Sequence, residues 1–273
     1  MRFPAILLLG CTPATAFAQE AEPVSAPETG PETGPQTGPR WEISSGAEFD
    51  SGDYGTGTEI DILSVPNRLG MSIGRVKFVA AIPHYRIEGP STVIPGNVLG
   101  LPLLTQPQPV EGDSVTRSGW GDLELGAVYA LPVGAVNLSL SGSVKLPTAE
   151  NNLGTGETDY TVGADVSKAL SDSFIPFASF SYTLPGAPDG ISLQDRYAAT
   201  AGVATWLGSK AQLYASYRYA ANPDAAATSD QRLQAGLNTS IGAGLSLGFF
   251  GSAGMSRGAP DRSAGLRLGF AFD

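Results

Sequence analysis

The stretch that decides the fold is Asp122-Leu-Glu-Leu-Gly-Ala-Val-Tyr-Ala-Leu131. In an extended chain its large apolar side chains fall on one face, and two acidic residues and a glycine fall on the other. Alternation with a period of two residues is typical of a β-strand whose two faces meet different surroundings. The stretch is about ten residues long, roughly twice an ordinary soluble strand and enough for a tilted strand to cross a bilayer.

The same alternation returns in Val136-Asn-Leu-Ser-Leu-Ser-Gly-Ser-Val-Lys-Leu146 and in the last residues of the chain. The connections alternate between short ones, such as 67–71 and 132–134, and longer ones, such as 88–118. Short periplasmic turns and long outer loops are the rule in outer-membrane barrels, so both termini should lie on the periplasmic side. The pattern predicts strands at 41–50, 56–66, 72–87, 119–131, 135–147, 157–169, 173–184, 195–207, 210–221, 229–241, 244–256 and 262–272.

These observations predict an all-β fold, a transmembrane antiparallel up-and-down β-barrel of about 12 strands. An unpaired backbone N–H or C=O group costs several kcal/mol in hydrocarbon, so the first and last strands should pair and close the sheet. A secreted β-sandwich would also alternate, but its strands are ordinarily shorter. The length of the segments therefore favours the barrel.

The composition agrees with a membrane protein. Charged residues make up 15% of the chain, below the roughly 25% of soluble domains, while no apolar stretch approaches the roughly 18 residues of a membrane helix. The net charge of -10 argues against nucleic acid as a partner, because phosphates reward basic patches.

The N-terminus has the features of a targeting segment. Arg2 supplies a positive start, an apolar run follows, and Ala16-Phe17-Ala18 is a small-residue cleavage pattern. We predict a signal peptide over residues 1–18. The alternative is a lipoprotein signal that ends at Leu8-Leu9-Gly10-Cys11, with the cysteine lipidated.

The rest of the chain divides into two parts. Residues 19–40 repeat Glu-Thr-Gly-Pro at 28–31 and 32–35, and such proline and glycine density predicts a disordered periplasmic tether. Residues 41–273 form the predicted outer-membrane β-barrel. The chain is accordingly expected in the cell outer membrane, exported through a cleaved signal peptide, with outer-membrane lipid, lipopolysaccharide and the assembly machinery as partners.

Two neighbouring stretches carry a family likeness: Gly119-Trp-Gly-Asp-Leu-Glu-Leu-Gly-Ala-Val-Tyr-Ala-Leu131 and Val144-Lys-Leu-Pro-Thr-Ala-Glu-Asn-Asn-Leu-Gly-Thr-Gly-Glu-Thr-Asp159. They resemble the outer-membrane proteins associated with the meta-cleavage pathway of phenol degradation, over about residues 119–184. The resemblance implies an outer-membrane channel, with aromatic or other small hydrophobic compounds as its solutes, and no catalytic residues. One departure is that outer-membrane barrels usually end on an aromatic residue, whereas here Phe272 is followed by Asp273.

Polar residues of the alternating segments are expected to line the lumen. The acids lie mainly on early strands and the arginines on late ones, so the two sets should face one another across the pore near its outer mouth. Such a field would orient dipolar solutes and select ions; the alternative is that the charges pair and plug the lumen. By parity the inward-pointing charged residues are Glu48, Asp122, Glu124, Asp165, Arg196, Arg218, Arg232 and Arg267.

Patterns for catalysis or metal binding are sparse. Outer-membrane phospholipases carry a serine two residues from their histidine, but the one histidine here, His84, is followed at that spacing by Arg86. We interpret His84 as a structural or rim residue and predict no enzyme. With no cysteine in the mature chain and no second histidine, neither a metal nor another cofactor is predicted. Calcium at the outer loops stays open as an alternative, through Asp113, Glu150, Asp159 or Asp189.

The long connection 88–118 is apolar and proline-rich from Pro90 to Leu104. An exposed apolar loop is a liability unless it folds inward or meets a ligand or membrane. We expect it to constrict the mouth and receive a hydrophobic solute, or else to rest on lipopolysaccharide or a partner. Aromatic residues near strand ends are expected to form interfacial girdles: Trp41, Tyr129, Tyr160, Tyr182, Tyr197, Tyr217 and Tyr219.

The sequence thus predicts a channel or facilitator for the passive uptake of small solutes, aromatic or hydrophobic ones among them. The alternative is a structural or adhesive barrel whose plugged lumen transports nothing. Twelve strands lie between eight-stranded barrels, which side chains can fill, and sixteen-stranded open porins. The strand count therefore leaves both functions open.

Overall fold

The computed structural model describes residues 38–55, 57–90, 93–96, 101–104, 114–171, 173–188, 192–223 and 227–273. The predicted signal peptide at 1–18, with Cys11, and the predicted tether up to residue 37 lie outside these ranges. Within them, no helix has the length and apolar character needed to cross a membrane.

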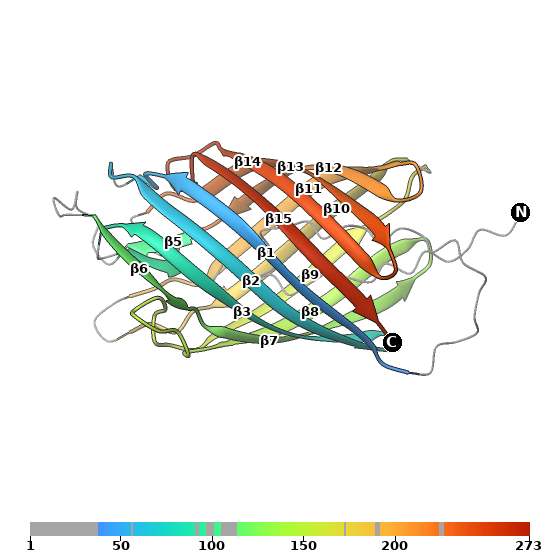
Figure 1. Cartoon of the computed structure of the whole chain (residues 1–273), viewed down its shortest axis with the longest axis horizontal. Helices are drawn as coiled ribbons and strands as arrows, with labels where there is room; N and C mark the ends of the chain where they lie inside the picture. Colours follow the sequence, from blue (N-terminus) through green and yellow to red (C-terminus); the bar gives the residue numbers. More distant parts are fainter. Residues whose placement is uncertain are drawn as a thin grey trace, which may run out of the picture.

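The described residues form β-strands that follow one another along the chain (Figure 1). Most of the wall strands have nine to fourteen residues, the length predicted for bilayer crossing. The strands are β1 (Arg40–Gly52), β2 (Ile60–Ile73), β3 (Val76–Gly89), β4 (Val93–Gly96), β5 (Leu101–Leu104), β6 (Val115–Trp120), β7 (Leu123–Val133), β8 (Val136–Leu146), β9 (Asp159–Ser167), β10 (Ile175–Leu184), β11 (Arg196–Leu207), β12 (Ala211–Ala220), β13 (Asp230–Gly242), β14 (Leu245–Gly254) and β15 (Arg262–Phe272).

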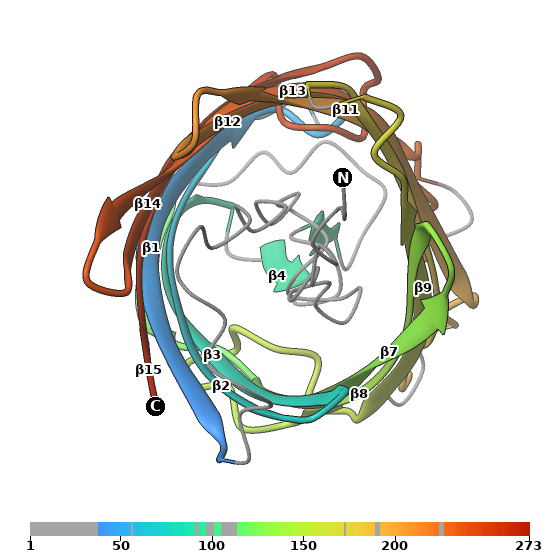
Figure 2. The same cartoon turned by 90° about the vertical axis from the view of Figure 1, so that its right-hand side faces the viewer.

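The sheet closes on itself because β1 pairs with both β2 and β15. Strands that follow one another along the wall are antiparallel, and β6 and β7 share one position because both pair with β3. Counted over the described residues, the ring has twelve positions, and Figure 2 shows it from one end. The structure confirms the predicted closed, antiparallel twelve-strand barrel, with the first and last strands paired.

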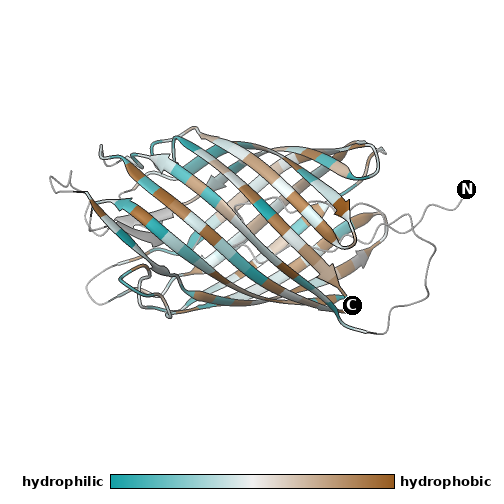
Figure 3. Ribbon diagram, viewed as in Figure 1, coloured by the Kyte–Doolittle hydropathy of each residue, from teal (hydrophilic) through white to brown (hydrophobic). Residues whose placement is uncertain are grey.

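The outer surface of the barrel follows the alternation in the sequence. On β15, Leu266, Leu268 and Phe270 are exposed, whereas Ser263 and Gly269 on the other face are buried. Figure 3 shows hydrophobic and hydrophilic residues alternating in this way along the wall strands. So much exposed apolar surface would be a liability in water, but lipid tails cover it in a bilayer.

The turn predicted at 67–71 is wrong. β2 continues through these residues to Ile73, and the chain turns at Gly74 and Arg75. Gly74 adopts a φ of 59°, a left-handed conformation that a residue without a Cβ reaches at little steric cost. The sequence misled because Pro66 followed by asparagine reads as a turn, whereas the structure keeps both residues inside a strand.

The wall tolerates two prolines by placing them side by side: Pro66 of β2 lies opposite Pro83 of β3. A proline has no N–H to give to a ladder, and each proline lies where pairing with its other neighbour lapses. Next to Pro83, the single strand predicted at 119–131 divides into β6 and β7, and the Gly121 N–H donates to the Pro83 carbonyl at 2.8 Å. The division is a correction that the missing proline N–H explains.

The connection predicted at 88–118 is shorter than expected and partly structured. β3 extends to Gly89, β6 begins at Val115, and between them β4 and β5 form an antiparallel hairpin in which Val93 pairs with Leu104. The hairpin lies toward the end of the barrel opposite the C-terminus (Figure 1) and, seen along the barrel, β4 lies within the ring of strands (Figure 2). The backbone of this segment therefore runs into the mouth.

The close approach at Gly121 gives a test of this part of the wall. A Cβ there would lie 2.7 Å from Tyr85 Cε2 and 2.9 Å from Pro83 Cγ, so Gly121→Ala should lower the free energy of unfolding by about 1–3 kcal/mol. Urea unfolding in lipid vesicles measures the change. Gly142→Ala is the matched control, because a Cβ there meets Thr161 O at 3.9 Å; equal stabilities of the two variants would contradict the packing described.

Candidate functional site

The inner face of the barrel concentrates charge toward its outer end, meaning the end opposite the two termini. Asp165 and Arg267, two of the eight residues predicted to point inward, are half-buried. Residues next to the eight in sequence are exposed on the other face, as Tyr197 is beside Arg196 and Leu233 is beside Arg232. A pore-lining role for the eight stays a prediction, but the structure buries six of them: Glu48, Asp122, Glu124, Arg196, Arg218 and Arg232.

One group of inner-face charges, called here the arginine cluster, consists of Asp50, Arg218, Asp230 and Arg232. Arg232 donates from Nε to Asp230 Oδ1 at 3.0 Å and from Nη2 to Oδ2 at 2.8 Å. The Nε of Arg218 lies 3.6 Å from the same Oδ2, and the Nη1 of Arg232 lies 3.9 Å from Asp50 Oδ1. Ser263 donates a hydrogen bond to Asp50. Asp230 therefore serves two buried guanidinium groups, and Asp50 adds a second carboxylate beside Arg232.

A second group, called here the lysine cluster, consists of Asp122, Lys145 and Asp159. Lys145 Nζ lies 3.2 Å from Asp122 Oδ2 and 3.0 Å from Asp159 Oδ2. Asp122 also accepts the Ala149 N–H at 2.8 Å, and Asp159 accepts the Gly186 N–H at 2.9 Å. The cluster thus ties β7, β8 and β9 to the outer loops that follow β8 and β10.

Most of these ion pairs lie within one strand or join adjacent strands, whereas the sequence suggested acids facing arginines across the lumen. The exception is the pair of Asp50 on β1 with Arg232 on β13, three positions away around the ring. Arg218 and Arg232 lie directly opposite one another on β12 and β13, and Asp230 precedes Arg232 by two residues on the same face. Sequence reasoning missed Asp50, Asp230 and Lys145 as partners, although each has inward parity. Parity tells which side a residue faces, but it does not give the stagger of the strands that brings partners together.

Arg196, on β11, differs from Arg232, which donates two hydrogen bonds to Asp230. Its side chain is 1% exposed, yet its Nε and Nη2 atoms are buried and have no hydrogen-bond partner among the described residues. The charged groups that act on it are Arg218, Asp159 and Asp230. The strand register places Arg196 beside Thr183 of β10.

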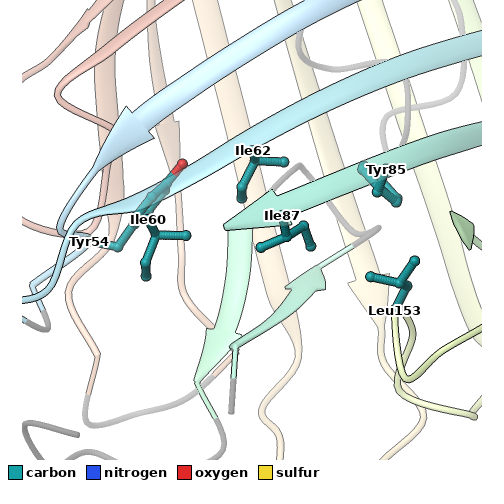
Figure 4. Close-up of a cluster of buried hydrophobic side chains, with 6 residues drawn as sticks. All are labelled: Tyr54, Ile60, Ile62, Tyr85, Ile87 and Leu153. Carbon is teal, nitrogen blue, oxygen red and sulfur yellow. The ribbon is translucent and has the colours of Figure 1, made fainter. Parts of the chain in front are cut away.

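An apolar cluster occupies another part of the inner face at the outer end (Figure 4). It draws on β2, β3 and the outer connections that follow β1 and β8. β2 and β3 stand six positions around the ring from β11 and β12, which carry Arg196 and Arg218. Tyr54, in contrast, lies close enough to Asp50 and Arg232 for their charges to act on it. Burial raises the pKa of Tyr54, in the connection after β1, well above its ordinary value. The cluster comprises Tyr54, Ile60, Ile62, Tyr85, Ile87 and Leu153.

Aromatic side chains gather on the outer face at both ends of the barrel. At the outer end, the rings of Tyr197 and Tyr219 stack with centroids 5.6 Å apart, and Tyr182 donates to Asp195 at 2.5 Å. This arrangement is typical of interfacial girdles. The residues predicted for the girdles divide between the two ends: Tyr160, Tyr182, Tyr197, Tyr217 and Tyr219 near the outer end, and Trp41 and Tyr129 near the end with the termini.

The remaining candidates have structural contacts. The His84 ring packs edge-on against Trp120, with centroids 5.2 Å apart. Of the acids considered for calcium, Asp159 belongs to the lysine cluster and Glu150 accepts the Trp120 N–H at 3.2 Å. Among the residues with described positions, no three metal-ligating side chains come together. Two further acids considered for calcium lie outside the described residues: Asp113 and Asp189.

The fold is shared with solved outer-membrane barrels. The COG4313 outer membrane channel from Pseudomonas putida F1 matches with a TM-score of 0.68 and 13% identity, over 91% of this chain and 100% of that chain. The NanC porin matches with a TM-score of 0.51 and 8% identity, over 85% of this chain and 99% of that chain. The translocator domain of the autotransporter NalP from Neisseria meningitidis matches with a TM-score of 0.50 and 13% identity, over 89% of this chain and 90% of that chain. No family model and no curated protein sequence matches the chain. At these identities the likeness shows the fold, that of an outer-membrane-type β-barrel.

Asp230, the shared carboxylate of the arginine cluster, should contribute to the stability of the barrel. Asp230→Asn keeps the shape of the side chain but removes the charge on which Arg218 and Arg232 depend, and breaking such a buried pair costs about 3–5 kcal/mol. Urea unfolding in vesicles should show this loss of stability. The control is Asp261→Asn at an exposed carboxylate, where a change within about 0.5 kcal/mol is expected. A D230N variant as stable as D261N would contradict the ion pairs described.

Proposed function

We propose that the chain is an outer-membrane channel or facilitator for the passive uptake of small solutes. The observation that carries this proposal is a closed barrel with an apolar outer face and buried charge on its inner face. An apolar exterior suits a bilayer, and charges and hydrogen-bonding groups along an interior suit a passage for polar or dipolar molecules. The proposal places the protein in the cell outer membrane, reached through the signal peptide predicted at 1–18.

Small aromatic or hydrophobic compounds are the solutes that we propose. The apolar cluster at the outer end supports this choice, because an apolar solute is stabilised wherever it replaces water against apolar surface. The hairpin β4–β5 runs within the ring near the same end, where it would constrict the mouth. The resemblance to outer-membrane proteins of phenol degradation points to the same class of solute.

A second function is favoured by a specific observation. The ion pairs of the arginine and lysine clusters are almost fully buried, so neighbouring groups enclose these charges at the outer end of the interior. If these clusters and the hairpin together fill the lumen, the barrel is structural or adhesive and transports nothing. Conductance separates the two functions.

We propose the same partners whether the barrel is a channel or is plugged, because they follow from its exposed surfaces. The rows of exposed apolar side chains would face outer-membrane lipid, and the tyrosines of the outer end would meet lipopolysaccharide. Near the C-terminus, the rings of Phe270 and Phe272 stack with centroids 5.5 Å apart. These aromatics would serve as the signal for the assembly machinery.

Planar-bilayer recording and liposome swelling test the channel. The wild-type chain should give discrete conductance steps, and replacing residues 93–104 by a short Gly-Ser linker should raise the conductance and admit larger solutes. The control carries the same linker inserted after Pro223, in the connection between β12 and β13, and should conduct like the wild type.

Two results would count against the account. Equal conductance with and without the hairpin would contradict the proposal that the hairpin constricts the mouth. No conductance in any variant would contradict the channel and favour the plugged barrel.

A further inference from the structure

Arg196 is a buried cation with two nitrogen donors that are unused in the described structure. It is 1% exposed, and its Nε and Nη2 atoms have no acceptor among the described residues. An unsatisfied buried donor is unfavourable, and more so when the group is charged. Arg218 and Arg232, on the next two strands, both use Asp230. Arg196 thus lies beside two arginines that share a carboxylate, while two of its own donors are buried without an acceptor in the described part of the chain.

The surroundings of Arg196 on its own face are small and polar. Ala198 and Ala220, which are paired neighbours and buried, offer no side-chain acceptor. Thr183, the register partner on β10, has its hydroxyl 2.9 Å from that of Thr161. Two hydroxyl groups carry two protons and their mutual bond uses one, so the pair has a donor left for an anion beside Arg196.

The charge around Arg196 limits what would bind. Asp159 and Asp230 are the acids that act on it, but each already holds another cation: Lys145 lies 3.0 Å from Asp159, and Arg232 lies 2.8 Å from Asp230. A carboxylate at Arg196 would give its unpartnered donors an acceptor, which neither of these acids supplies by a hydrogen bond. A second negative charge would add further repulsion from Asp159 and Asp230.

We propose that Arg196 binds the carboxylate of a small monocarboxylate solute in the outer half of the barrel. The planar guanidinium matches a carboxylate through two parallel N–H···O bonds, and Arg218 adds positive potential from the neighbouring strand. The site rests on the proposed channel function, because a solute reaches Arg196 only through the lumen. It also deepens that function, since it names an anionic group on the solute.

Benzoate and its neutral analogue benzamide provide the test. They share an aromatic ring and differ in the charge of the group that would meet Arg196. In saturation-transfer NMR titrations of the full chain in detergent micelles, benzoate should bind more tightly than benzamide. Arg196→Gln should weaken benzoate binding about tenfold and leave benzamide binding unchanged, while Arg196→Lys should restore part of the benzoate affinity.

Two further variants make the comparison specific. Arg262→Gln removes an exposed arginine, on β15, and should keep the wild-type affinity for benzoate. Thr183→Val removes the hydroxyl next to Arg196 without removing a charge, and should weaken benzoate binding about threefold; it provides the test should R196Q fail to fold. Heat-modifiable gel migration shows which variants are folded.

The outcomes separate this site from the channel. Equal affinity of the wild type for benzoate and benzamide, or an R196Q affinity for benzoate within about twofold of wild type, would overturn the site. Arg196-dependent benzoate binding in a protein that conducts nothing across bilayers would support the site and contradict the channel. Conductance without Arg196-dependent benzoate binding would contradict the site and leave the channel standing.

Discussion

The hydrocarbon of a bilayer tolerates no unpaired backbone N–H or C=O group, and the wall of this barrel is arranged around that constraint. Trp41 pairs with Phe272 and Ser51 pairs with Arg262, so the first and last strands close along nearly their whole length. Pro66, which cannot donate, is set where the ladder to its other neighbour already lapses. Closure then sorts the side chains into one face for lipid and one for the interior.

The interior obeys a second requirement, that charges removed from water must be balanced. The arginine and lysine clusters meet it through pairs along the wall, and so they stiffen the outer half of the barrel as well as setting its field. Beside them, two buried donors of Arg196 have no acceptor in the described part of the chain. Such a guanidinium suits a passage in which a solute supplies the missing acceptor while it is bound.

Strand alternation made the wall predictable: the barrel, its closure and all twelve positions follow from a period of two and from segment length. Local signals failed where tertiary pairing overrode them, since Pro66 and its neighbour read as a turn but lie within β2. The inward parity of Arg218 and Arg232 was readable, yet Asp230 as their common partner was not, because strand stagger is absent from parity. Contacts such as those of Gly121 depend on neighbours distant in sequence and had no signal at all.

The central claim is that lipid covers one face of each strand and the interior covers the other. Nitroxide labels placed one at a time along β12 test it directly, with oxygen as the lipid-soluble collider and a nickel chelate as the water-soluble one. Labels at Leu213, Ala215 and Tyr217 should collide more often with oxygen than labels at Tyr214 and Ser216, giving a period of two residues. Equal oxygen accessibility at both sets of positions, in protein reconstituted into vesicles, would contradict the barrel in a bilayer.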